Sequence, residues 1–136
     1  MGFGVRGPTR RCCASNIDDG VHAPYDLLAL PGELGVNCPK LEMLHHRFHE
    51  STSVSYAFGA VAALHSDILR LRNAYQKVRE PQLMRERSVR ASDPAVVRSI
   101  LDQLLQHDAT YQAIEEFRLV CEEAISEQAD VQCDGD

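Results

Sequence analysis

The sequence predicts an all-α protein: an antiparallel helical hairpin, or a small three-helix bundle, with an irregular N-terminal arm. Two long stretches carry apolar residues at alternating intervals of three and four, which is helical spacing. A polar, basic connection bounded by Pro81 and Pro94 separates the two stretches. The first 37 residues hold six of the eight glycines, which is typical of irregular structure. We therefore expect an arm at 1–37, a helical body at 38–128 and an acidic tail at 129–136.

The body begins with a short helix predicted at about 39–50. Pro39 suits the first position of a helix, because its missing N–H would have no partner there. Leu41, Leu44 and Phe48 then mark one helical stripe. The serines and threonine at 51–53 supply a break and a candidate N-cap for the next helix.

The next helix, predicted at 53–80, has the clearest pattern in the chain. Its apolar seam follows the a and d positions of a coiled coil from Val54 to Val78. The first half is also apolar away from the seam, so it needs cover on more than one side, which helix 39–50 can provide. Pro81 is expected to end or kink this helix.

The last helix is predicted at 94–128. Asp93 is a candidate N-cap and Pro94 a candidate first residue. The apolar stripe from Val97 to Ile125 passes Asp108 without a change of phase, which favours one long helix. A kink near Asp108 stays open as an alternative.

Composition limits the class of protein. A chain of 136 residues is long enough for one domain with a core of its own. It has no apolar segment typical of a secretory signal or a bilayer span. Its five cysteines are odd in number and lack C-x-x-C spacing, which indicates an intracellular, reducing compartment.

The expected function is that of a non-enzymatic interaction protein. The sequence has no nucleophile elbow, P-loop or dinucleotide fingerprint, and we expect no cofactor. We expect an adaptor or a small subunit of an assembly that packs its seams against a protein partner or a second copy. The candidate partner-binding residues are Val61, Leu64, Ile68, Leu71, Tyr75, Leu104, Tyr111 and Ile114.

A basic segment at 70–90 provides an alternative function. It has seven basic and two acidic residues, although the whole chain has a net charge of −6. Such a segment attracts an acidic protein surface or nucleic-acid phosphates. The few aromatic residues and the lack of a known reader motif argue against nucleic acid. The candidate residues are Arg70, Arg72, Lys77, Arg79, Arg85, Arg87 and Arg90.

The histidines provide a second alternative, a metal-binding helical protein. His45 and His49 are four residues apart on one predicted helix face, and Cys38 is a possible third ligand. A structural zinc site normally needs four ligands, so we interpret these histidines as exposed or capping residues. If Glu80 lies opposite Pro94 in the hairpin, His65 and His107 could also meet across it, but we interpret each as a separate polar residue at the edge of the seam.

Cys12 and Cys13 follow two arginines in the predicted arm. This is a possible S-acylation site, and only such a modification would place the chain on a membrane. Otherwise we expect these two residues to be exposed thiols.

Overall fold

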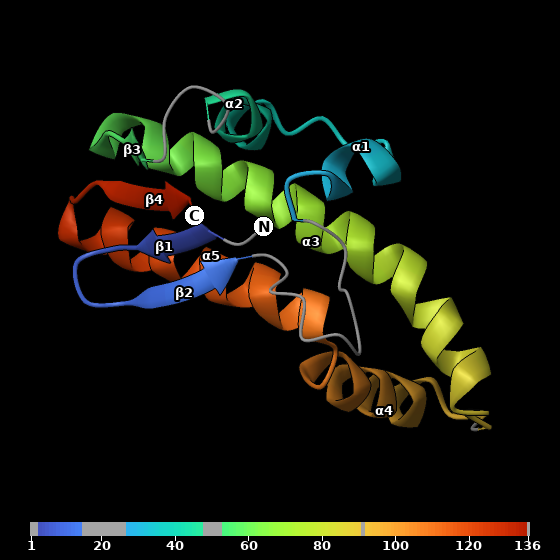
Figure 1. Cartoon of the computed structure of the whole chain (residues 1–136). Helices are drawn as coiled ribbons and strands as arrows, with labels where there is room; N and C mark the ends of the chain where they lie inside the picture. Colours follow the sequence, from blue (N-terminus) through green and yellow to red (C-terminus); the bar gives the residue numbers. More distant parts are fainter. Residues whose placement is uncertain (1–2, 15–26, 48–52, 91, 136) are drawn as a thin grey trace.

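The chain folds, in the computed structural model, into a four-stranded antiparallel sheet with helices packed against it. The predicted all-α hairpin or three-helix bundle is therefore wrong. Figure 1 shows the sheet at one end of the molecule and the longest helix extending away from it. The structure describes residues 3–14, 27–47, 53–90 and 92–135.

The sheet has the strand order β2-β1-β4-β3, and every neighbouring pair is antiparallel. The strands β1 (Phe3–Arg6) and β2 (Arg11–Ala14) form a hairpin, and β4 (Val131–Gly135) lies between β1 and β3 (Ser53–Tyr56). Strands from the two ends of the chain are thus neighbours, as Figure 1 shows.

Two regions that were predicted to be irregular supply most of this sheet. The predicted arm at 1–37 contains β1, β2 and the short helix α1 (Leu30–Leu34), and the predicted tail at 129–136 contains β4. These strands have only four or five residues, and β1 pairs with β4 from the other end of the chain. Local sequence patterns do not report such distant pairing, which explains the error.

One face of the sheet points into the core. Cys12, Val5, Cys133 and Val54 lie side by side across the four strands, and all four are buried. Residues opposite one another on paired strands share a face, so this row forms a continuous apolar surface. Ser55, which follows Val54, points to the other side and is exposed.

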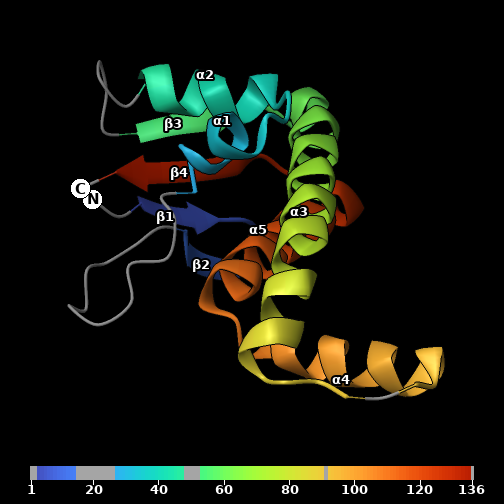
Figure 2. The same ribbon diagram turned by 90° about the vertical axis from the view of Figure 1, so that its right-hand side faces the viewer.

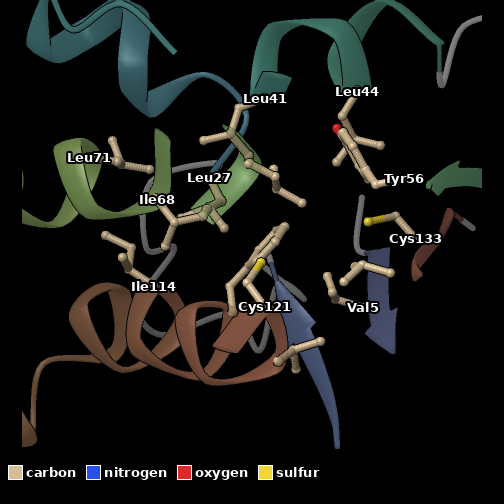
Figure 3. Packing of buried hydrophobic residues seen from close by; sticks show 14 of the residues in the cluster. Val5, Leu27, Leu41, Leu44, Tyr56, Ile68, Leu71, Ile114, Cys121 and Cys133 are labelled. Atoms are coloured by element: carbon tan, nitrogen blue, oxygen red, sulfur yellow. The ribbon is translucent and has the colours of Figure 1, made fainter. Parts of the chain in front are cut away.

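The helices cover this inner face. The helix α3 (Phe58–Glu86) packs against α5 (Ala109–Glu127), while α1 and α2 (Pro39–Arg47) pack on α3. Figure 2 shows α2 and the sheet on the same side of α3. In Figure 3 the side chains of the sheet, of α2, and of the pair α3 and α5 meet in one core, with Tyr56 from the sheet close to Leu44 of α2.

A buried carboxylate fixes the start of α2. Asp67 of α3 is 1% exposed, and its Oδ2 accepts the backbone N–H of Lys40 at 2.6 Å. Its other oxygen accepts Arg70 Nη2 at 2.7 Å. The carboxylate thus serves an otherwise unpaired N–H in the first turn of α2. The helix begins at Pro39, as the sequence predicts, and residues 48–50 of the expected helix lie outside the described part.

The helix predicted at 53–80 is shifted toward the C-terminus. Residues 53–56 form β3, because they alternate between exposed serines and buried Val54 and Tyr56. The helix then continues through Pro81 to Glu86. Pro81 removes one helical hydrogen bond, but burial of Leu83 beyond it stabilises the additional turn.

The single helix predicted at 94–128 is two helices, α4 (Pro94–Gln106) and α5. The break lies at the position where a kink was left open. The Asp108 side chain accepts the backbone N–H of Tyr111 at 2.9 Å and thereby caps α5. Asp93 caps α4 in the predicted way, by accepting the N–H of Ala95 at 2.9 Å.

Candidate functional site

A projecting unit is formed by the C-terminal end of α3, the connection that follows it, and all of α4. We call this unit the tip (residues 77–90 and 92–106). Figure 2 shows α4 lying across the end of α3, away from the strands. A small apolar cluster of its own holds the tip together, with Leu83, Leu101 and Leu105 at its centre. The main core near the sheet is a separate cluster. The tip is therefore an extension of the fold rather than a part of the central core.

Asp108 connects the tip to the body. Its Oδ1 accepts the Tyr75 hydroxyl at 2.7 Å and its Oδ2 accepts Arg79 Nε at 2.8 Å. The same carboxylate caps α5, so one side chain joins α3 to the α4–α5 break. Burial and the hydrogen bond to Asp108 raise the pKa of Tyr75 well above its usual value. Tyr75 therefore stays protonated and acts as a donor at neutral pH.

A second ion-pair network joins α3 to α4. Arg98 Nη2 bonds to Glu80 of α3 and lies 2.8 Å from Asp102 Oδ1 within its own helix. The hydrogen bond from Arg98 lowers the pKa of Glu80 below its usual value. Arg79 also reaches Glu86 at 3.0 Å. The pair of Arg98 and Glu80 thus ties α4 to α3, while the other two pairs lie within one helix each.

Three of the seven predicted basic-patch residues are neutralised by carboxylates. Arg70 pairs with Asp67 at 2.7 Å, Arg72 pairs with Glu115 at 3.1 Å, and Arg79 pairs as described above. Arg70 and Arg72 lie outside the tip. Asp67 is three residues from Arg70 on the same helix, whereas Glu115 and Asp108 are brought to Arg72 and Arg79 by the fold.

The other four patch residues are exposed and carry the uncompensated charge of the tip. In the part of the chain that the structure describes, none of them has an ion pair with a carboxylate, whereas Glu80 and Glu86 each have an arginine partner. With six basic and four acidic residues, the tip has a net charge of +2 on a protein whose net charge is −6. These four residues are Lys77, Arg85, Arg87 and Arg90.

Exposed apolar side chains accompany these cations. Val78 of α3 is 48% exposed and Val96 of α4 is 47% exposed. Pro81 is also exposed. The apolar spacing predicted that Val78 lies on the seam of the helix, and it did not single out Val96. The stripe of α3 turns away from its partners near the tip, which leaves Val78 in solvent.

The side chains predicted to bind a partner lie within the chain's own interior. Val61, Leu64, Ile68, Leu71, Tyr75 and Ile114 are buried, and Leu104 and Tyr111 are partly buried beside the small cluster of the tip. The surface that packs on these residues comes from α5, α2 and the sheet of the same chain. Their role in binding another chain stays a prediction. Because most of these residues are buried, the exposed surface is the better candidate for a partner-binding site.

The histidine predictions have different outcomes. His45 lies in α2, but its side chain and all of His49 fall outside the described residues. His65 contacts Glu122 at 3.3 Å, and His107 caps the end of α4, so these two histidines do not meet across the hairpin. Across the described residues, no group of three or more His, Cys, Asp or Glu side chains is placed to hold a metal ion.

The cysteines of the core are poorly reactive. Burial raises the pKa of Cys121 to about 12 and that of Cys38 to about 11. Cys12 and Cys133 flank Val5 on opposite sides, which places their Cα atoms roughly 10 Å apart and too far for a disulfide. Cys12 is buried in β2, contrary to the expected exposed thiol, while the side chain of Cys13 is outside the described part.

The described surface includes two hollows of similar size. The larger, of about 500 Å³, lies beside β1 and β2 and contains Arg6, Arg11, Glu116 and Asp134. Its two guanidinium groups are matched by two carboxylates, and Arg6 already pairs with Asp134 at 3.2 Å. The smaller, of about 390 Å³, lies between α4 and α5. The larger hollow is also lined by Cys12, and the smaller one by Tyr111 and Glu115.

Comparisons with known proteins add no homologue. No protein-family model matches the chain, and neither does any curated protein or solved structure. None of the described helices is long and apolar enough to cross a lipid bilayer.

Proposed function

We propose that the chain is a non-enzymatic interaction protein, an adaptor or a small subunit of a larger assembly, and that it contacts its partner through the tip. One observation carries the proposal. Lys77, Arg85, Arg87 and Arg90 are exposed without a carboxylate partner in the described structure, on a unit that ion pairs hold in place. Exposed charges of one sign steer the approach of an oppositely charged surface.

The rigidity of the tip supports this proposal. The Asp108 and Arg98 networks join α3, α4 and α5, so Lys77 and Arg85 are presented by a helix that is fixed at this end, and Arg87 and Arg90 follow it in the connection to α4. A scaffold that is ordered before binding loses less conformational entropy when a partner docks. The acidic balance of the rest of the chain makes the tip the natural point of contact for an acidic surface.

Nucleic acid is a second candidate for the same surface, because three of the four unpaired cations are arginines.

The proposed setting is an intracellular, reducing compartment. The described cysteines Cys38, Cys121 and Cys133 are free thiols, which fits such a compartment.

The experiment is quantitative affinity capture from the native host with two charge-reversal variants. Arg85→Glu combined with Arg87→Glu removes positive charge from the tip. Arg11→Glu combined with Arg47→Glu makes the same change in net charge at exposed positions elsewhere. We expect the tip variant to lose the specific partner and the control to retain it, as measured by mass spectrometry. Equal retention by both variants would overturn the proposal.

A further inference from the structure

We propose that the tip recognises an acidic amphipathic segment of a partner protein, in which carboxylates alternate with aliphatic side chains. This inference rests on the proposed function and specifies the chemistry of the partner. It is carried by the combination of unpaired cations and exposed aliphatic side chains on one small unit of the fold.

The outer face of α3 provides the first part of the argument. Lys77, Val78, Pro81 and Arg85 are all exposed. At 100° per residue these four positions fall within an arc of about 100°, so they share one face. They span roughly 12 Å along the helix axis, which is a little over two helical turns. This face therefore offers positive charge at both ends and apolar surface between them.

The same chemistry occurs on the rest of the tip. Arg87 and Arg90 are exposed in the connection after α3, and Val96 is 47% exposed on α4. A partner that supplied carboxylates alone would leave the valines in water. A partner that also supplies aliphatic side chains removes this apolar area from water and gains affinity.

The composition of the tip disfavours nucleic acid. Residues 77–106 contain no Phe, Tyr or Trp. Single-stranded nucleic acids gain much of their binding energy from bases stacked on aromatic side chains. Duplexes are bound mainly through their phosphates, and such binding would not use Val78, Pro81 or Val96. The exposed aliphatic side chains thus favour a protein segment over either form of nucleic acid.

The test compares three synthetic probes by fluorescence anisotropy. The first is an acidic peptide with leucines at helical spacing, and the second has a serine in place of each leucine. The third is a short DNA duplex. We expect the leucine peptide to bind about tenfold more tightly than the serine peptide, because it covers two half-exposed valines. We also expect it to bind more tightly than the duplex at the same salt concentration.

Two variants separate the contributions of charge and apolar contact. Arg85→Glu with Arg87→Glu should weaken both peptides and flatten the salt dependence of their binding. Val78→Ser should weaken the leucine peptide alone, and circular dichroism should show an unchanged fold because this side chain is half-exposed. The matched control is Phe58→Ser, which removes a 44% exposed side chain from the other end of α3 and should change neither affinity.

Several results would overturn the inference. They are equal binding of the two peptides, tighter binding of the duplex, no binding of any probe, or self-association of the chain that Arg85→Glu abolishes in light scattering. The proposed function fails on a different result, because it is tested by capture from the host. Capture that depends on the tip, together with equal binding of the two peptides, would preserve the function and reject the amphipathic segment.

Discussion

Asp108 is the side chain whose removal should most affect the attachment of the tip. In Asp108→Ala, α5 loses its N-cap, which costs about 1 kcal/mol. Arg79 loses a charge-assisted hydrogen bond of 2.8 Å, which is worth about 1.5–3 kcal/mol in a site where the carboxylate is only 8% exposed. Tyr75 loses its Asp108 acceptor as well. Because Arg79 retains Glu86, we expect a total loss of about 2–4 kcal/mol in the free energy of unfolding.

The matched control is Asp93→Ala. Asp93 is also an N-cap aspartate, but it is exposed, and within the described residues its side chain accepts only the hydrogen bond from Ala95 N–H. Its removal should cost about 0.5–1 kcal/mol. Asp108→Asn should fall between the two variants, because the amide oxygen still caps α5 while the charge opposite Arg79 is lost.

Urea denaturation followed by circular dichroism measures all three variants. The reasoning requires Asp108→Ala to lose at least about 1 kcal/mol more than Asp93→Ala. Equal losses would mean that Asp108 is only a helix cap and that the tip is not anchored through it. A larger loss in Asp93→Ala would reject the assignment outright.

Three further predictions concern pH, the core and the thiols. Arg98 lowers the pKa of Glu80 in the folded state, so the ionised carboxylate stabilises the fold above the unfolded pKa near 4.5, and this stabilisation is lost as the pH falls through the lower folded pKa. Urea titrations of Glu80→Gln should therefore show a smaller loss of unfolding free energy than the unmodified chain on acidification below about pH 4.5. Ile68→Asp places a charge in the fully buried core and should cost more than about 3 kcal/mol, whereas Lys77→Asp at an exposed site should cost less than about 1 kcal/mol; similar unfolding free energies for the two would contradict the burial. Cys121 should resist iodoacetamide in the native protein and react after unfolding, as peptide mass spectrometry would detect, and rapid native alkylation would show that the thiol is accessible.

The central part of α3 shows what could be predicted from the sequence. From Val61 to Tyr75 the spacing identified a buried helical stripe, because every turn repeats the same apolar face. The predicted boundaries of this helix, residues 53 and 80, were wrong for two separate reasons. Val54 fits both a helical period and the two-residue period of Ser53–Tyr56, and only pairing with β4 decides between them. Beyond Pro81, the packing of Leu83 outweighs the local helix-breaking signal.

The sheet was beyond the reach of local patterns. β1 and β4 pair between the two ends of the chain, and neither strand exceeds five residues. Short strands gain their stability from pairing with one another and from packing on α5, and both are long-range contacts. Asp108 was different, because an aspartate three residues before Tyr111 has N-cap spacing, and the unbroken apolar stripe around it favoured one continuous helix instead.

The tip was predicted in outline from its charge, but not in detail. The basic run at 70–90 indicated a positive surface. Glu115, which pairs with Arg72, and Asp108, which pairs with Arg79, are more than 25 residues away along the chain, so the fold is needed to identify these pairs. The exposed aliphatic residues also depend on how α3 and α4 pack.

Amide hydrogen exchange of the chain, free and bound to the partner captured from the host, tests the central claim most directly. It reports which backbone segments become protected when the partner is present. The account predicts new protection at residues 77–90 and in α4, with the rest of the chain unchanged. Protection confined to α2 or to the strands of the sheet would contradict it, because the partner would then bind a surface other than the tip.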